Sequence, residues 1–78
     1  MTQVLSPLPG TFYQKPSPEA ELFMSPGDTV SNGDVIGLVE VMKTFIEVKS
    51  DVDGTFTEYL AEDGMPVMAG QALVEVAN

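Results

Sequence analysis

The chain contains no cysteine and no histidine. Without cysteine it has no disulfide framework, no thiol nucleophile and no thiolate metal site. Without histidine it lacks the side chain that most often serves as a general base near neutral pH. Self-contained catalysis is therefore not expected, and the composition favours a carrier or a binding module.

Positive charge is also scarce. Three lysines, no arginine and twelve acidic residues give a net charge of −9 at pH 7. Such a chain repels phosphate backbones and anionic lipid, so we expect it to bind neither nucleic acid nor a membrane surface. A docking partner should offer a basic or neutral surface, and their encounter should weaken as salt is added. The acidic residues are scattered beside turns and predicted strands, which is typical of a solvated surface.

Long hydrophobic runs are missing as well. No stretch of about 18 apolar residues is present, so no membrane-spanning helix is predicted. The first ten residues, MTQVLSPLPG, contain neither the basic segment nor the apolar core of a secretion signal. We therefore expect a cytoplasmic protein. With 78 residues, 44% of them hydrophobic, the chain is expected to form one small domain over residues 1–78.

Short β segments separated by turns dominate the sequence, and no amphipathic helix is evident. Residues 17–24 would suffice for one helical turn. Because the segment is so short and contains Pro18, a loop is favoured instead. The first two predicted strands are separated by only a few residues and should form a hairpin. The predicted strands are residues 35–39, 45–48, 55–60 and 72–76.

An internal repeat runs through the chain. Ser6–Phe12 (SPLPGTF) matches Ser50–Phe56 (SDVDGTF) at an offset of 44, and residues 27–33 (GDTVSNG) match residues 64–70 (GMPVMAG) at an offset of 37. The chain therefore consists of two copies of one β motif. Two copies that each have one apolar face should close on each other as a flattened sandwich with a pseudo-twofold axis. The repeated glycines are expected at turns with positive φ or at close backbone approaches.

The two offsets differ by seven, so the first copy carries seven extra residues. This insertion must lie within residues 13–26, between the two matched segments. Residues 14–21 (QKPSPEAE) are polar and rich in proline, which is typical of a projecting surface loop. We therefore expect a loop that protrudes from the sandwich at this point.

The boundary between the copies, near residues 41–44, places Lys43 at the turn of the predicted hairpin. A lysine that an enzyme acylates needs an accessible ε-amine and a rigid base, and two flanking strands provide both. The ordinary interpretation of a Met-Lys pair is a solvated lysine beside a methionine that covers the edge of the core. At the midpoint of a symmetric repeat, a modified lysine is favoured. Lys15, in the inserted loop, and Lys49, at a strand end, have no such position.

Two segments carry a resemblance to a known family. Glu40–Lys43 (EVMK) is similar to the Glu-Ala-Met-Lys biotinylation motif of biotin carboxyl carrier proteins. Ser6–Tyr13, followed by Pro16–Ala20 (PSPEA), resembles the Gly-Thr-Phe-Tyr…Pro-Ser-Pro stretch of the same family, which includes its protruding thumb. The sequence thus resembles the biotinyl domain of the acetyl-CoA carboxylase carrier family from Ser6 to about Val76.

The resemblance implies a fold and a cofactor. The fold would be an all-β flattened barrel or sandwich of two four-stranded antiparallel sheets with a thumb loop. Lys43 would take biotin through an amide bond made by a biotin protein ligase with ATP, and Met42 would help the ligase to recognise the hairpin. The thumb residues expected near the biotin ureido ring are Pro16, Ser17, Pro18 and Glu19.

The resemblance also implies partners. A biotin carboxylase would carboxylate the biotin and a carboxyltransferase would receive the carboxyl group, most simply for acetyl-CoA in fatty acid biosynthesis. The chain would act as a carrier without catalytic residues of its own, and as an isolated domain it would be monomeric. Two residues beside the attachment site depart from the motif. Val41 replaces the common Ala and adds bulk, and Thr44 replaces the common Met and adds a hydroxyl.

Four alternative functions stay open. Lipoyl domains share the two-copy fold, but their usual context is Asp-Lys-Ala, whereas here Met42 precedes the lysine and Thr44 follows it. A carrier for another biotin-dependent carboxylase would use the same lysine. An unmodified docking module would carry no biotin despite an active ligase, and a small carboxylate enzyme would keep its activity after a change at Lys43.

Overall fold

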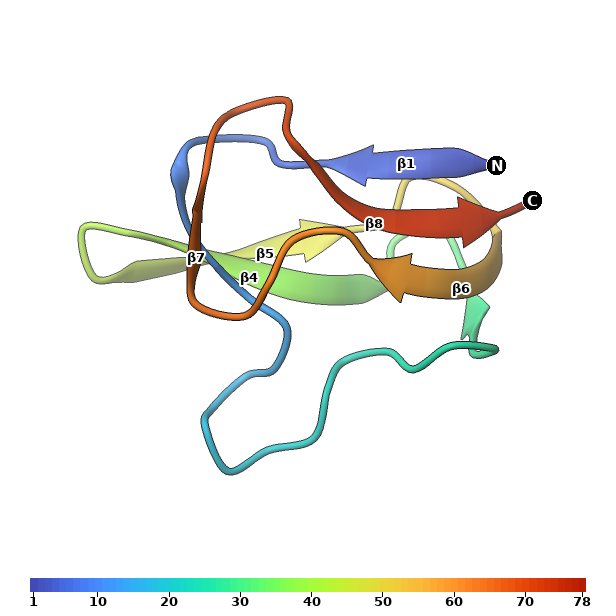
Figure 1. The fold of residues 1–78 in the computed structure, drawn as a ribbon, viewed down its shortest axis with the longest axis horizontal. Helices are drawn as coiled ribbons and strands as arrows, with labels where there is room; N and C mark the ends of the chain where they lie inside the picture. The colour runs from blue at the N-terminus through green and yellow to red at the C-terminus, as the bar shows by residue number, and fades with distance from the viewer.

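Eight β-strands and no helix make up the computed structural model, which describes all 78 residues (Figure 1). No helix long and apolar enough to cross a membrane is found. The strands are β1 (Thr2–Leu5), β2 (Gly10–Tyr13), β3 (Thr29–Val30), β4 (Val35–Val41), β5 (Thr44–Lys49), β6 (Gly54–Tyr59), β7 (Met65–Val67) and β8 (Ala72–Ala77).

The strands form two four-stranded antiparallel sheets, with the orders β1-β8-β6-β3 and β5-β4-β2-β7. Moving every strand four places along the chain, with β8 followed by β1, converts the first order into the second. The predicted all-β sandwich of two related halves is therefore confirmed. The β4–β5 hairpin projects at one end of the domain, and both termini lie at the other (Figure 1). There the Thr2 hydroxyl donates to the Asn78 side-chain oxygen at 3.1 Å.

Hydrophobic residues on the inner faces of both sheets form one core. In β2, Phe12 is fully buried and Tyr13 faces outward, as the two-residue period of a strand requires. Phe56 occupies the matching position of the second copy and is buried as well. The core residues are Val4, Phe12, Val30, Ile36, Val39, Val48, Phe56, Ala61, Val67, Leu73, Val74 and Val76.

The two copies of the sequence repeat form equivalent hydrogen bonds. Ser6 and Ser50 are both buried, and the hydroxyl of each donates at 2.7 Å to the carbonyl two residues later, of Leu8 and Val52 respectively. A buried hydroxyl needs such a partner, because an unpaired one costs about 1–3 kcal/mol. Each serine therefore fixes the chain where it leaves a sheet, once in each half.

The repeated glycine turns are equivalent too. Gly27 and Gly64 have positive φ, +96° and +78°, which favours glycine over residues that carry a Cβ. The Gly27 N–H donates to the Phe56 carbonyl at 2.9 Å, and the Gly64 N–H donates to the Phe12 carbonyl at 2.7 Å. Each half therefore uses its glycine turn to bond the central phenylalanine of the other half.

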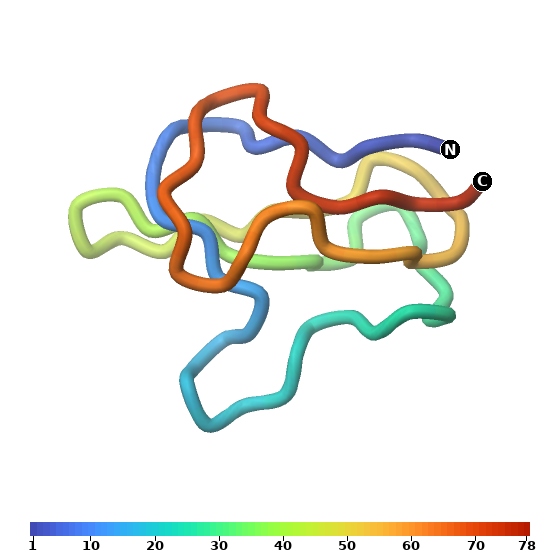
Figure 2. Tube along the Cα trace, viewed as in Figure 1, coloured from blue at the N-terminus to red at the C-terminus, as the bar shows by residue number.

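The four predicted strands are β4, β5, β6 and β8, each shifted or extended by one or two residues. Strands β1, β2, β3 and β7 were not predicted as separate strands, because they are only two to four residues long. Residues 17–24 form no helix, as expected. They lie in the loop 14–28 between β2 and β3, which projects from the sandwich as the predicted thumb (Figure 2).

Tyr59 links the two halves, because its ring lies 6.0 Å from the Phe12 ring and 4.8 Å from the Phe56 ring between centroids. Its hydroxyl donates to the Ile36 carbonyl at 2.8 Å. Burial of this hydroxyl disfavours the phenolate and raises the pKa of Tyr59 from 10.0 to about 12.

The raised pKa of Tyr59 predicts a loss of stability in strong base. In the unfolded chain the phenol ionises near pH 10, so its contribution to stability is complete below pH 10 and lost as the pH rises from 10 to 12. We expect the loss to be about 1–2 kcal/mol, less than the full shift implies, because water screens the partly exposed side chain. Urea unfolding at pH 8, 10 and 11 measures it, and Tyr59→Phe should have a smaller pH dependence over that range.

Candidate functional site: the β4–β5 hairpin and the thumb pocket

The turn of the β4–β5 hairpin consists of Met42 and Lys43. The facing pair Val41 and Thr44 closes the ladder, so only two residues remain between the strands. Met42 has φ 50° and Lys43 has φ 67°, and no other non-glycine residue has positive φ. Positive φ at both central residues is the requirement of a type I′ hairpin turn, which usually takes Asn-Gly. Left-handed backbone costs residues with a Cβ about 1–2 kcal/mol each.

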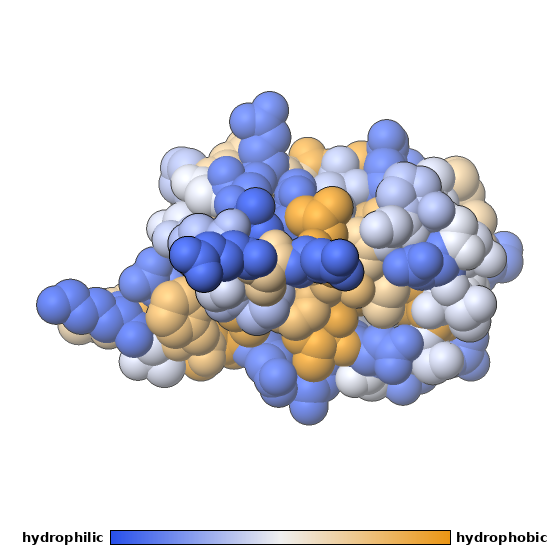
Figure 3. All heavy atoms as spheres, turned by 90° about the horizontal axis from the view of Figure 1, so that it is seen from below, coloured by the Kyte–Doolittle hydropathy of each residue, from blue (hydrophilic) through white to orange (hydrophobic).

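Both turn residues are freely accessible. The Met42 side chain is 93% exposed, so it does not cover the edge of the core, and the ordinary interpretation of the Met-Lys pair is wrong on this point. Lys43 is exposed and forms no ion pair, because the one salt bridge joins Lys49 to Glu47 at 4.0 Å. The hairpin projects from the body of the domain in the surface view (Figure 3). An enzyme can therefore reach the Lys43 amine without unfolding the domain.

The residues that flank the turn have different environments. Val41 is partly buried and packs against the core, whereas Thr44, directly opposite, is exposed. The larger side chain at residue 41 therefore helps to anchor the end of β4. The turn rests on a packed strand end, which gives Lys43 the fixed base that a carrier lysine needs.

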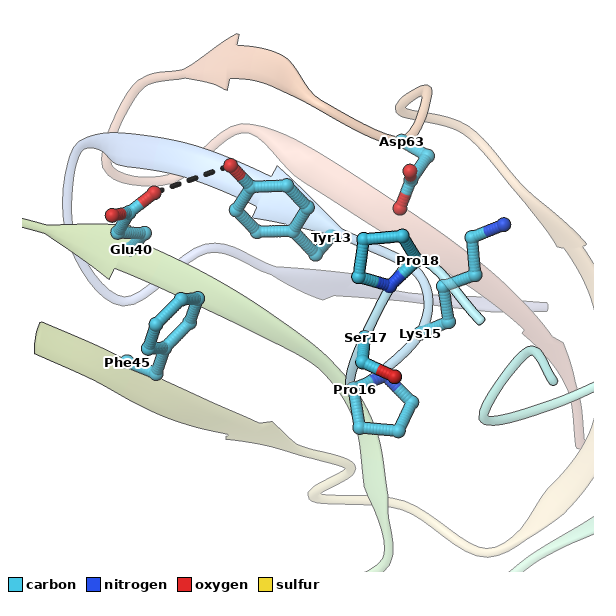
Figure 4. Close-up of a pocket in the computed structure, with 8 residues that line it drawn as sticks. All are labelled: Tyr13, Lys15, Pro16, Ser17, Pro18, Glu40, Phe45 and Asp63. Carbon is cyan, nitrogen blue, oxygen red and sulfur yellow. Dashed lines mark hydrogen bonds between the residues drawn. The ribbon is translucent and has the colours of Figure 1, made fainter. Parts of the chain in front are cut away.

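A pocket with a volume of about 420 Å³ lies beside the hairpin, between it and the thumb (Figure 4). Glu40 and Phe45 form its hairpin side, and they face each other across β4 and β5, one pair before the turn. The pocket is lined by Tyr13, Lys15, Pro16, Ser17, Pro18, Glu40, Phe45 and Asp63.

Tyr13 connects the base of the thumb to the hairpin. Its hydroxyl donates to Glu40 Oε1 at 3.2 Å (Figure 4), and its ring lies 6.1 Å from the Phe45 ring between centroids, in a tilted arrangement. All three side chains lie on the outer face of the sheet, because Tyr13 is the diagonal neighbour of Glu40. The hydrogen bond to the Glu40 carboxylate, with smaller contributions from desolvation and from the charges of Glu40 and Asp63, raises the pKa of Tyr13 above its ordinary value of 10.0.

Glu40→Ala is expected to lower the pKa of Tyr13 toward 10, because the substitution removes both the hydrogen-bond acceptor and the nearby negative charge. Absorbance near 295 nm during titration with base follows the two tyrosines. Tyr59, whose raised pKa is due first to burial, should keep its value near 12 and serves as the internal control. An unchanged titration in Glu40→Ala would show that the Tyr13–Glu40 bond is not formed in solution.

The structure brings most of the predicted site residues together. Pro16, Ser17 and Pro18 line the pocket beside the hairpin, whereas Glu19 is exposed outside the lining. Sequence reasoning assigned no role to Tyr13, Phe45 and Asp63, although all three line the pocket. For Tyr13 and Phe45 the sequence carried a signal. Each lies in a strand next to one of the motifs and beside a residue that faces inward, so the two-residue period of a strand predicts that it faces outward. Asp63 gave no signal, since its partners lie far away in the sequence.

A symmetric β-sandwich with an exposed lysine on a strained hairpin turn is the arrangement expected of a class of protein, the domains that present a lysine for modification. A family model that is named for biotin and lipoyl and described as "Biotin-requiring enzyme" matches residues 2–76. Because the match covers nearly the whole chain, the chain belongs to this family.

The curated relatives include proteins named biotin carboxyl carrier protein of acetyl-CoA carboxylase. The one from Chlamydia trachomatis serovar D is 48% identical over 75 residues, which are 96% of this chain and 46% of the relative. A second, from Nostoc, is 36% identical over 76 residues, 97% of this chain and 42% of the relative. A chloroplastic one from Arabidopsis thaliana is 40% identical over 72 residues, 92% of this chain and 28% of the relative. The chain thus spans about half the length, or less, of these relatives.

Proposed function

We propose that this domain carries biotin on Lys43 and presents it to two active sites of an acetyl-CoA carboxylase. A biotin protein ligase would form the amide at Lys43 Nζ with ATP. A biotin carboxylase and a carboxyltransferase would then be the docking partners, in cytoplasmic fatty acid synthesis. The domain acts as a carrier and contributes no catalytic residue. The carrier proteins to which it is similar support this assignment.

The observation that carries the proposal is the turn at Met42 and Lys43. Two residues with a Cβ and positive φ occupy a turn where asparagine and glycine are usual. In addition, Met42 is 93% exposed although it is apolar. Packing explains neither feature. Strained residues persist where they serve a function. Recognition of Met42 by a ligase and acylation of Lys43 account for both features.

The pocket beside the hairpin suits biotin in size and chemistry. Its volume lies within the range of about 300–1,000 Å³ that is usual for small-molecule sites. The rings of Phe45 and Tyr13 offer apolar faces for a fused bicyclic ring, and the carboxylates of Glu40 and Asp63 can accept hydrogen bonds from ureido N–H groups. Pro16, Ser17 and Pro18 would form the thumb side of this site, and Glu19 would lie at its outer margin.

The role of the protein is presentation. When attached, biotin accepts a carboxyl group at one active site and gives it up at another. Val41 anchors the end of β4 in the core, so the Lys43 side chain moves about a fixed origin. Tethering makes the second encounter intramolecular, with an effective concentration in the millimolar range for short flexible links. The high negative charge favours docking on basic surfaces.

Lipoylation is the second candidate within the same family. Two features favour biotin over lipoate. Met42 occupies the place where lipoyl domains usually have Asp, and the chain has a thumb of seven extra residues in its first half. The carrier proteins to which the chain is similar are biotin carriers by name.

The deciding experiment is the intact mass of the protein after incubation with biotin protein ligase, ATP and biotin, followed by peptide mapping. A gain of one biotinyl group on the peptide that contains Lys43 is expected. A folded protein that gains no biotin would contradict the proposal. Incubation with lipoate ligase and lipoate then separates the lipoyl carrier from an unmodified docking module.

Deletion of residues 14–20 is expected to leave the sandwich folded, because none of these residues belongs to the core. The melting temperature should fall by no more than roughly 8 °C, which corresponds to about 1 kcal/mol in a domain of this size. Transfer of the carboxyl group, or selectivity between ligases, should change because the thumb side of the pocket is gone. Circular dichroism and ligase kinetics measure the two effects, and unfolding of the variant would show that the thumb is part of the core.

A further inference from the structure

The base of the thumb is bonded to the opposite half of the domain. Gln14 is the first residue after β2, and its backbone N–H donates to Asp63 Oδ1 at 2.7 Å. Its side-chain Nε2 donates to the Ala61 carbonyl, also at 2.7 Å. The Phe23 N–H donates to the Gln14 carbonyl at 2.9 Å and closes the loop. The two segments that meet at the thumb base, around Gln14 and around Phe23, are therefore joined through Gln14.

The internal repeat shows that Asp63 is free to perform this role. In the first half, the turn of residues 25–28 is closed from within: the Asp28 N–H donates to the Ser25 carbonyl at 3.0 Å, and the Ser25 N–H donates to Asp28 Oδ2 at 2.9 Å. The equivalent turn of the second half, residues 62–65, ends in Met65, which has no carboxylate to return the bond.

This second turn has two carboxylates, that of Glu62 at the position of Ser25 and that of Asp63 at the position of Pro26. The carboxylate of Asp63 is the one that reaches the thumb. Asp63 accepts no bond from its own turn and accepts one from Gln14 instead. Asp63 also lines the pocket. In Figure 4 it lies next to Pro18, on the opposite side of the pocket from Phe45. The carboxylate of Asp63 in the second turn thus holds the thumb, whereas the carboxylate of Asp28 in the first turn closes its own turn.

We infer that Asp63 is a positioning residue that holds the thumb in place to form the side of the pocket that faces the hairpin. The inference rests on the proposed function, in which this pocket receives the group carried by Lys43. Asp63 acts through Gln14 and touches no reacting atom. A carboxylate accepting a backbone N–H gives a charge-assisted bond, stronger than a bond between neutral groups. Without it, Gln14 is held by its side-chain bond to Ala61, by the bond from Phe23 and by a long 3.4 Å bond from the Tyr59 hydroxyl to its carbonyl.

The first test is amide hydrogen exchange measured by NMR on the unmodified protein. In Asp63→Ala the Gln14 and Phe23 amides should exchange about tenfold faster or more, while the Phe12 and Phe56 amides in the core keep their protection. Asp63→Asn should restore most of the protection of Gln14, because its side-chain oxygen still accepts a hydrogen bond. Unchanged exchange at Gln14 in Asp63→Ala would overturn the inference.

Asp53→Ala is the matched control. Asp53 accepts the Asn32 N–H at 2.8 Å, which is the same kind of exposed bond from a carboxylate to a backbone amide, outside the thumb. This variant should speed exchange at Asn32 and leave Gln14 unaffected. If Asp53→Ala speeds exchange at Gln14 as much as Asp63→Ala does, the effect is a general loss of stability and the inference is wrong.

The second test uses the biotinylated protein and follows the Ser17 amide resonance. Biotinylation should shift this resonance in the wild type and shift it by less than half as much in Asp63→Ala, with Asp63→Asn close to the wild type. Equal shifts in the wild type and Asp63→Ala would overturn the inference. Failure of the wild type to take biotin would contradict the proposed function instead, and the exchange test, which needs no biotin, would still decide whether Asp63 holds the thumb.

Discussion

Lys43→Arg is expected to abolish biotin incorporation and to leave the fold unchanged. Arginine keeps the positive charge, but its guanidinium stays protonated and is not acylated by a ligase that needs a free amine. The Lys43 side chain is exposed and forms no ion pair, so its replacement removes no contact of the folded state. The backbone strain at φ 67° is the same for both residues. Intact mass after the ligase reaction should show only unmodified variant, where the wild type gains one biotinyl group.

Lys15→Arg and Lys49→Arg are the controls for this experiment. Lys15 is partly buried beside the pocket, and Lys49 lies in β5 with its ammonium 4.0 Å from Glu47. Neither lies on a turn, so both variants should be biotinylated as completely as the wild type. Biotin on Lys43→Arg, or its loss in either control, would place the attachment at another lysine and refute the assignment.

The features that the sequence predicts are local or periodic. The hairpin was predicted because two apolar segments lie only a few residues apart, and the lysine between them followed from that spacing. The repeat predicted two equivalent halves because Ser6 and Ser50, and the glycines after them, recur in the same order. These signals are short spacings and a recurring order of residues, both of which are present in the sequence itself.

The features that the sequence did not predict depend on contacts between distant residues. The bond from Tyr13 to Glu40 joins residues 27 apart, and the bond from Gln14 to Asp63 joins residues 49 apart. Both form because antiparallel pairing brings β2 between β4 and β7. The two-residue strand β3 was also not predicted, since its pairing with β6, rather than its own composition, makes it a strand.

The exposure of Met42 is another feature that the sequence did not predict. Apolar character alone predicts a residue that covers the core, and in the structure Met42 is almost completely exposed. The turn decides this, because Met42 and Lys43 form the tip of the hairpin, beyond the last paired residues Val41 and Thr44. In this domain a departure from the usual burial pattern therefore coincides with the proposed functional residue, as is common at binding sites.

Gly54→Val is expected to destabilise the domain more than any substitution on its surface. A Cβ at residue 54 would collide with the Ala77 carbonyl oxygen and would lie 2.7 Å from Val76 Cγ1. Overpacking costs about 1–3 kcal/mol when side chains can move aside. Here the obstacle is backbone of β8, which pairs with β6 and cannot retreat without losing ladder bonds. We therefore expect a loss of about 3 kcal/mol or more, and a melting temperature lower by roughly 12 °C or more.

Gly10 is the equivalent residue of the first half, and a Cβ there would lie 2.5 Å from the Glu40 carbonyl oxygen. Gly10→Val should therefore be as damaging as Gly54→Val. Gly64→Ala is the matched control, because its φ of +78° strains the backbone but no atom lies within 4 Å of the added Cβ. It should cost about 1 kcal/mol. If thermal unfolding of Gly54→Val matched that of the wild type, the two glycines would not hold equivalent close approaches, and the two-copy description of the domain would fail.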